Sequence, residues 1–474
     1  MKDKKITICL IAVLMVNSAL AATYYVFEED GTIQAAIDAC EDFDTVVIAP
    51  GTYRGSGNCG INFNGKAITV RSTDPTDPQI VNSTIIDCAG IARGFVFNTW
   101  EKADSKVAGL TIINGVAMVG GAIYSSNNSS PSITNCVIRN NSAFFGGGIA
   151  CINGKSHPVI TNCQIIANSA SMIFGGGGIY LDGSSPTIKN CIISGNTAPE
   201  GGAIYSHNAS NPLITNCTIS TNTAYNSAGA IYCFNSSNLI ISHSILWGNT
   251  APSAPEILVG NLGAATTIQI SYCDIQGGQT SVILDNDCTV DWGQGNIDID
   301  PQFVDTGYTD KSRRDVEGDY HLLEESPCID AGDSGFVAGP DETDIDGNPR
   351  ILGEKIDLGA DEYVFPIPAI VKIMPKTLNL QSNGNWISCT IQLPDEYSIY
   401  DIDTDTIALN KQIQPTWYKT DEGANKLLIK LDRSEIQDML ENAESPVLLR
   451  VAGKLNDGSD FAGTDTIRVL KQGQ

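Results

Sequence analysis

The repetitive middle of the chain has very little charge. Six residues between positions 107 and 273 are charged, namely Arg139, Lys155, Asp182, Lys189, Glu200 and Glu256. Enzymes that cleave polysaccharides need clustered carboxylates, a bound Ca²⁺ or a base that accepts a proton. Six scattered charges cannot form such a cluster, so their scarcity argues against catalysis on this segment.

The chain also lacks the usual clusters of metal-binding cysteine and histidine. No CxxC pair occurs among its 14 cysteines, and two of its four histidines, His157 and His207, fall in turn segments two repeats apart. Thirteen cysteines follow the first 22 residues, and an odd number leaves at least one free thiol in an oxidising compartment. We expect a disulfide between Cys40 and either Cys59 or Cys88.

Long apolar runs are absent after the first residues, so we expect no membrane-spanning helix in the mature chain. The chain begins with the basic segment MKDKK, continues with the apolar segment ITICLIAVLMV and then has Ala19, Leu20 and Ala21. This order is typical of a secretory signal peptide. We therefore expect residues 1–22 to be removed and the protein to be secreted or held at the cell surface.

One short phrase is repeated five times in the weakly charged segment. It reads GGAIY, GGGIA, GGGIY, GGAIY and AGAIY, ending at Tyr124, Ala150, Tyr180, Tyr205 and Tyr232. A second phrase of the form ITNCVI places Cys136, Cys163, Cys191 and Cys217 at intervals of 27, 28 and 26 residues. The apolar runs are three to five residues long and suit strands rather than helices. The pattern predicts stacked coils of a right-handed parallel β-helix with the Ile and Cys columns inside.

An asparagine stands before each repeated cysteine, at Asn135, Asn162, Asn190 and Asn216. Asparagine tolerates the left-handed backbone that a tight corner needs better than other residues with a side chain. Its amides can also bond from coil to coil when the corners stack. We expect these residues to form corners and an amide ladder.

These repeats resemble those of chlamydial polymorphic membrane proteins, and the coil plan resembles the pectate-lyase-like superfamily. The segment DGTIQAAIDACEDFDTVVIAPGTYRG at 30–55 resembles the helical N-terminal cap of such proteins. The resemblance implies a β-helix over 23–363, with a cap at 23–55 and regular coils at 107–273. It implies an architecture and no particular reaction, because this fold carries many activities.

The composition changes near residue 281. Residues 281–363 hold 22 acidic and five basic residues, so this segment carries most of the net charge of −26. Its phrases IDIDPQF, SPCIDAGD, DIDGNPR and IDLGADEY are similar to choice-of-anchor Q domain proteins, which implies acidic C-terminal coils and a cap. From 366 to 474, runs with a period of two indicate a separate β-sandwich, immunoglobulin-like or cohesin-like, with one helix capped by Ser434.

Two candidate sites follow from these patterns. Strand alternation sends the last residue of the GGAIY phrase outward. These tyrosines either stack on one another and stabilise neighbouring strands, or form a face on which sugar rings stack. The carbohydrate-binding candidates are Tyr124, Tyr180, Tyr205 and Tyr232. In ETDIDGN, oxygen side chains at alternate positions and a turn glycine resemble the start of a Ca²⁺ loop, although Gly353 stands at its twelfth position. The metal candidates are Glu342, Asp344, Asp346 and Asn348.

The sequence favours a non-enzymatic β-helix protein that binds glycan or protein as an adhesive scaffold. The expected partner is an extracellular polysaccharide or a surface protein. The alternative is a polysaccharide lyase or glycoside hydrolase. Nucleic acid is excluded as a partner, because a net charge of −26 opposes phosphate binding.

Overall fold

The computed structural model describes residues 21–29, 31–261, 265–285, 287–307, 318–340 and 342–471, so all but the end of the expected signal peptide lies outside the described residues. The chain divides into two units, Met1–Tyr363 and Val364–Gln474. Within the described ranges, no helix has the length and apolar character that a membrane span requires.

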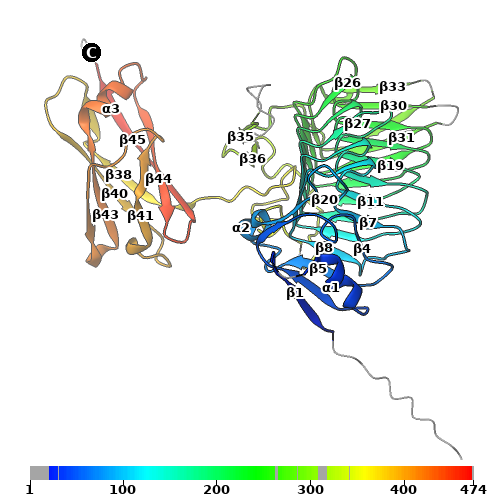
Figure 1. Ribbon diagram of the computed structural model, residues 1–474. Helices are drawn as coiled ribbons and strands as arrows, with labels where there is room; N and C mark the ends of the chain where they lie inside the picture. The colour runs from blue at the N-terminus through cyan, green and yellow to red at the C-terminus, as the bar shows by residue number, and fades with distance from the viewer. Residues whose placement is uncertain are drawn as a thin grey trace, which may run out of the picture. The chain divides into compact units, whose positions relative to one another are not determined.

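The first unit is a parallel β-solenoid of about nine turns (Figure 1). Sheet I contains β1 (Thr23–Val26), β2 (Thr45–Ile48), β5 (Thr69–Ser72), β8 (Lys106–Ala108), β12 (Ser132–Thr134), β16 (Val159–Thr161), β20 (Thr187–Lys189), β24 (Leu213–Thr215), β28 (Asn238–Ser242), β31 (Thr267–Ser271) and β34 (Thr289–Trp292). Sheet II contains β4 (Ile61–Asn62), β7 (Phe95–Phe97), β11 (Ile123–Ser125), β15 (Ile149–Cys151), β19 (Ile179–Asp182), β23 (Ile204–His207), β27 (Ile231–Phe234), β30 (Ile257–Gly260) and β33 (Val282–Leu284).

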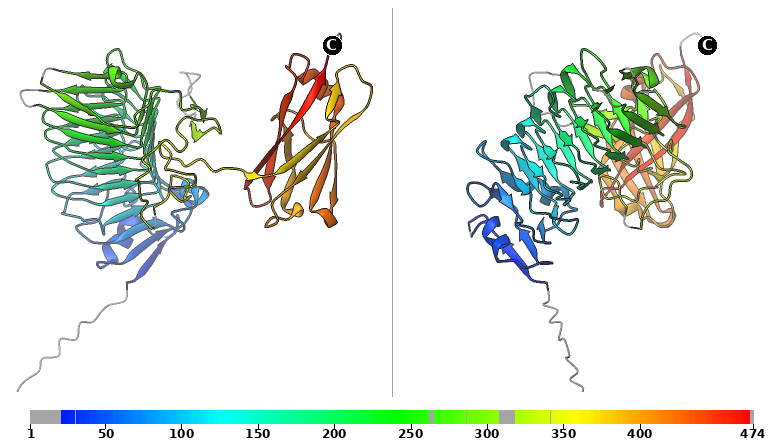
Figure 2. Two further views of the ribbon diagram at one scale, coloured as in Figure 1. Left: turned by 180° about the vertical axis from the view of Figure 1, so that it is seen from behind. Right: turned by 90° about the vertical axis from the view of Figure 1, so that its right-hand side faces the viewer.

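Sheet III contains β3 (Gly51–Tyr53), β6 (Thr84–Asp87), β9 (Thr111–Ile113), β13 (Val137–Arg139), β17 (Gln164–Ile166), β21 (Ile192–Ser194), β25 (Thr218–Ser220), β29 (Ile245–Trp247) and β32 (Asp274–Ile275). The shorter sheet IV contains β10 (Val116–Val119), β14 (Ser142–Phe145), β18 (Ser169–Ala170), β22 (Thr197–Glu200) and β26 (Thr223–Ser227). Figure 2 shows the strands of successive coils stacked above one another. The stacking follows from the repeat, because the inward isoleucines of successive coils pair with one another.

The inward columns are as the sequence predicts. Ile149, Ile179 and Ile204 occupy equivalent positions in sheet II and are fully buried. The repeated cysteines Cys136, Cys163, Cys191 and Cys217 are also buried. All 13 cysteines that the structure describes are free thiols, so the expected disulfide of Cys40 is not formed. Cys40 Sγ donates instead to the Ala36 carbonyl of the preceding helix, at 3.2 Å.

The asparagine corners are also as predicted, whereas their ladder is largely replaced by other bonds. Asn135, Asn162, Asn190 and Asn216 have φ of 53°, 52°, 51° and 52°, in the left-handed region. One bond joins two of them, from Asn190 Nδ2 to Asn162 Oδ1 at 3.3 Å. Asn162, Asn190 and Asn216 also donate to residues 342–344, a later segment of the chain, whereas Asn135 makes no side-chain hydrogen bond to another described residue.

A continuous ladder forms in a different, buried asparagine column. It runs through Asn141, Asn168, Asn196, Asn222 and Asn249. Each Nδ2 donates to Oδ1 of the next asparagine at 2.9 to 3.1 Å, and Asn249 donates to Glu256. All donors point the same way, so the last amide needs an acceptor.

Two short helices lie in the first coils. Helix α1 (Ile33–Ala39) begins after Thr32, whose side chain accepts a bond from Ala35 N–H, and its Ile33 and Ile37 are buried in the solenoid core. Helix α2 (Pro78–Ser83) begins after Asp77 and buries Val81. Near the end of the unit lie η1 (Gly278–Ser281) and the antiparallel pair β35 (Phe303–Asp305) and β36 (Asp319–Leu322).

The acidic segment departs from the expectation of further coils and a cap over 281–363. Strands β33 and β34 do continue the coils, but residues 318–340 and 342–363, which we call the strap, lie along the coil corners (Figures 1 and 2, yellow-green). Gly359 N–H donates to the His243 carbonyl at 2.9 Å, and Asn162 Nδ2 donates to the Asp344 carbonyl at 2.9 Å. The strap therefore uses the amides that would otherwise extend the corner ladder.

The second unit contains two sheets that share one apolar core. One sheet contains β37 (Ile367–Pro368), β39 (Thr377–Asn379), β41 (Ile402–Leu409), β44 (Val447–Leu455) and β45 (Asp460–Leu470). The other contains β38 (Ile370–Met374), β40 (Trp386–Gln392), β42 (Trp417–Asp421) and β43 (Lys426–Asp432). The remaining elements are η2 (Ile399–Asp401), η3 (Glu422–Ala424) and α3 (Arg433–Met439). The predicted cap Ser434 is wrong, because Asp432 accepts the bonds from the first turn of α3.

Candidate functional site

The tyrosine column lies outside the coil interior but is not an exposed platform. Tyr205 is 1% exposed and Tyr180 is 7% exposed, while Tyr124 and Tyr232 are half-buried. The rings of Tyr180 and Tyr205 stack with centroids 5.9 Å apart and an angle of 18° between their planes. Tyr180 and Tyr205 are therefore too buried for a sugar ring to stack on them, whereas Tyr124 and Tyr232 are partly accessible.

Neighbouring side chains cover the column. Phe145 lies 5.2 Å from the Tyr180 ring, and Phe174 lies 6.2 Å from the Tyr205 ring, between centroids. The Tyr180 hydroxyl bonds His207 Nε2 at 2.8 Å, and burial lowers the pKa of His207. Alternation along a strand predicts which side chains leave the coil interior, but it does not predict which loops fold over them.

The four predicted calcium ligands do not converge on one point. Glu342 pairs with Lys189 Nζ at 2.7 Å, and Asp344 is fully buried. The Asp344 carboxylate accepts bonds from the backbone N–H of Asp346 and Asn348, from Asn348 Nδ2 and from Glu362 N–H, at 2.8 to 3.2 Å. Asp344 thus orders the turn, and its oxygens are already occupied by donors.

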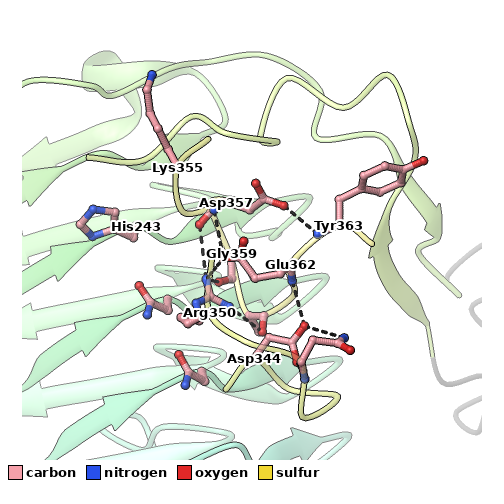
Figure 3. Close-up of polar contacts among 12 residues, drawn as sticks. His243, Asp344, Arg350, Lys355, Asp357, Gly359, Glu362 and Tyr363 are labelled. Carbon is pink, nitrogen blue, oxygen red and sulfur yellow. Dashed lines mark hydrogen bonds and ion pairs between the residues drawn. The ribbon is translucent and has the colours of Figure 1, made fainter. Parts of the chain in front are cut away.

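A buried arginine holds the following loop of the strap (Figure 3). Arg350 is 1% exposed and donates to the carbonyls of Asp357, Gly359 and Ala360 at 2.8 to 3.3 Å. It also pairs with Glu362 at 3.3 Å. Burial raises the pKa of Glu362 to about 8, more than Arg350 lowers it. This cluster is structural, because Arg350 joins three carbonyls and one carboxylate of the same loop.

The loop that Arg350 holds carries one carboxylate into a second cluster. His321 from β36, Asp346 from the acidic turn and Asp361 have potential ligand atoms that all lie within 4.8 Å of one another. His321 Nε2 lies 2.5 Å from Asp346 Oδ2, and His321 Nδ1 bonds Asp319. The hydrogen bond to Asp346 is the largest cause that raises the pKa of His321 to about 10, and burial raises the pKa of Asp361 to about 7.

Asp346 also lines a cleft between helix α2, the asparagine corner and the strap. The cleft has a volume of about 310 Å³. Its lining comprises Pro75, Thr76, Pro78, Val81, Asn82, Asn135, Cys136, Val137, Asn162, Gln164, Thr343, Ile345, Asp346 and Gly347. Three amides of this lining, Asn82, Asn135 and Gln164, make no side-chain hydrogen bond to another described residue. The cleft therefore combines free polar groups with apolar surface.

Sequence reasoning found one member of this site, Asp346, but missed the others. The strap, which carries His321 and Asp361, meets three earlier segments that carry Asn82, Asn135 and Gln164. A repeat predicts contacts between neighbouring coils only. The column of corner asparagines is a signal in the sequence, although the sequence does not show which later segment reaches it.

Comparison with protein families agrees with the coil architecture. The family model described as a right-handed β-helix region matches residues 43–178 and 152–297, which together span more than half of the chain. A search of curated proteins finds no match.

Proposed function

This chain belongs to the right-handed β-helix family, and from that premise we propose that it is a non-enzymatic scaffold that binds a saccharide in the cleft beside α2. A signal peptide at 1–22 would place it outside the cell or on the cell surface. Its partners would be extracellular polysaccharides or the glycans of surface proteins. The net charge of −26 opposes a nucleic-acid partner.

The observation that carries the proposal is the composition of the cleft. Asn82, Asn135 and Gln164 offer amide donors and acceptors, and Asp346 offers a carboxylate acceptor. Val81, Val137 and Ile345 provide apolar surface beside them. A sugar ring presents hydroxyl groups at its edge and C–H groups on its faces, so it complements both kinds of surface. The volume of about 310 Å³ is at the lower end of ligand sites, which favours one or two sugar units.

The organisation of the chain supports a scaffold role. We propose that α1 caps the first coil, because Ile33 and Ile37 pack into the solenoid core at its N-terminal end. We also propose that residues 366–474 form a β-sandwich, since their two sheets share one core. We also propose that the chain is related to polymorphic membrane proteins and to choice-of-anchor Q domain proteins. The repeats support the first relationship, and the recurring phrases of the acidic segment support the second.

A hydrolase or lyase is the second candidate, and one observation favours it. Asp346 and Asp361 bring two carboxylates together with His321 at the edge of the cleft. Paired carboxylates can serve as acid and base in glycoside hydrolysis. However, Asp361 is 7% exposed, and the two carboxylates share one imidazole, so we place binding first.

One experiment separates the two functions. The full chain is titrated calorimetrically with a panel of neutral and uronic-acid oligosaccharides, and each mixture is assayed for new reducing ends and unsaturated products. Binding without products is the expected result. Asn135→Ala and Gln164→Ala should each raise Kd about threefold to tenfold, since each removes a hydrogen bond.

The matched control is Gln269→Ala, because Gln269 is an exposed residue of sheet I away from the cleft lining. Its Kd should equal that of the unmodified chain. Products formed by the unmodified chain and lost in Asp346→Asn would establish the enzyme instead. Absence of binding across the panel would refute the saccharide proposal.

A further inference from the structure

The cluster of His321, Asp346 and Asp361 has the chemistry of a metal site that differs from the expected calcium loop. One imidazole nitrogen and two carboxylates converge from three places in the strap, with ligand atoms within 4.8 Å of one another. The three residues come from β36, from the acidic turn and from the loop held by Arg350. The backbone therefore positions the set from separate anchors, as a preorganised site requires.

Asp319 orients the imidazole. Its carboxylate bonds His321 Nδ1, and the backbone N–H of His321 also donates to this carboxylate at 3.2 Å. A histidine that binds a metal commonly donates its other ring N–H to a carboxylate, which fixes the ring and the tautomer. With Nδ1 occupied by Asp319, Nε2 is the nitrogen directed at Asp346 and Asp361.

Asp361 independently indicates a cation ligand. Its side chain is 7% exposed, yet its one hydrogen bond to another described residue is a long one, from Leu322 N–H to Oδ2 at 3.4 Å. A buried carboxylate is costly unless it is paired and well hydrogen-bonded. His321 is shared with Asp319 and Asp346, so the three carboxylates exceed the charge that one imidazolium supplies.

The outer side of the cluster is open. The side chains of His321 and Asp346 are 51% and 40% exposed. Water or a ligand can therefore complete the coordination from this side. Because Asp346 also lines the cleft, an ion bound here would lie at the cleft edge.

We propose that His321 Nε2, Asp346 and Asp361 bind one divalent transition-metal ion, with Asp319 as the positioning residue. Mixed nitrogen and oxygen ligands suit Mn²⁺ or Zn²⁺, whereas Ca²⁺ takes six to eight oxygen ligands. The ion would take the place of the proton that Nε2 otherwise shares with Asp346. This proposal does not depend on saccharide binding.

The test uses the full chain after treatment with a chelator, and Mn²⁺ alone as the probe. Electron paramagnetic resonance counts the free ion, and Mn²⁺ avoids confusion with the many thiols, which are poor ligands for it. The expected result is one Mn²⁺ per chain that Zn²⁺ displaces and Ca²⁺ displaces poorly. Asp346→Asn and Asp361→Asn should each weaken binding at least tenfold.

Asp291→Asn is the matched control, because it removes the same charge from an exposed strand residue and should leave Mn²⁺ binding unchanged. Circular dichroism confirms that each variant is folded. If Asp361→Asn fails to fold, Asp346→Asn still tests the site, because the Asp346 side chain is exposed. No Mn²⁺ or Zn²⁺ binding below millimolar concentration would overturn the proposal. Binding that survives Asp346→Asn would overturn it as well, whatever the saccharide assays show.

Discussion

Glu256 accepts the final bond of the buried asparagine ladder. Its Oε2 receives Asn249 Nδ2 at 2.7 Å, while its Oε1 is buried without a hydrogen-bond partner among the described residues. Burial raises the pKa of this carboxyl from 4.5 to about 8. A protonated Glu256 can still accept the amide bond without the cost of a buried charge.

This raised pKa predicts a dependence of stability on pH. The folded chain holds the Glu256 proton more tightly than the unfolded chain. The contribution of protonated Glu256 to the free energy of unfolding is therefore full below pH 4.5 and is lost as pH rises to about 8. Glu256→Gln keeps an acceptor and cannot ionise. Thermal melts at pH 5 and pH 8 should show that the variant gains stability relative to the unmodified chain at the higher pH. Parallel changes in both proteins would contradict the role of Glu256.

Cys163 tests the inward cysteine column. It is fully buried, with Sγ 3.2 Å from the Thr161 carbonyl and 3.5 Å from the Ile133 carbonyl. Cys163→Ser replaces a weakly polar sulfur by a hydroxyl in an apolar column and should lower the free energy of unfolding by roughly 1 to 3 kcal/mol. Urea denaturation measures the change. An unaltered midpoint would show that this column is not part of the core.

Tyr205 distinguishes a packing role from a surface role for the tyrosine column. Because Tyr205 is 1% exposed, Tyr205→Ala should cost about 3 to 5 kcal/mol of unfolding free energy. Tyr225, which is 62% exposed on sheet IV, is the matched control, and Tyr225→Ala should cost less than about 0.5 kcal/mol. Equal losses in urea denaturation would contradict the burial of Tyr205.

At the scale of the elements, the coils were predictable because their residues repeat. The Ile and Cys columns repeat at the coil length, and the asparagines repeat at the corners, so strand register follows directly from the sequence. The strap carries no repeat, and its partners lie up to 182 residues away. Loop closure over such distances depends on tertiary contacts that local pattern does not contain, which is why His321 and Asp361 were missed.

Arg350 should determine whether the strap stays against the coils. Arg350→Ala removes the bonds to three carbonyls and leaves Glu362 buried without its partner. Opening of the strap should become easier by about 3 to 5 kcal/mol, as when a buried pair is broken. Limited proteolysis and hydrogen exchange should show faster cleavage and exchange in 342–363. Lys355→Ala, a half-buried change in the same loop, serves as the control, and equal cleavage of both variants would count against the role of Arg350.

At the scale of the whole molecule, the acidic segment lies along the weakly charged coils, and the sequence did not predict this contact. Residues 107–273 carry six charges, while the strap concentrates the acidic groups and lays them along the corners of those coils. The polar groups that could bind a ligand therefore gather where strap, α2 and asparagine corner meet. The regular solenoid thus serves as a scaffold, and the strap forms a ligand cleft on it.

A crystal structure of the full chain with the tightest-binding oligosaccharide tests this account most directly. One or two sugar units should lie in the cleft, with hydroxyl groups bonded to Asn135, Gln164 and Asp346 and a ring face against Ile345. Sugar density in that position, with the glycosidic bonds intact, is the expected result. Density on another face of the chain, or a cleaved product in the cleft, would contradict it.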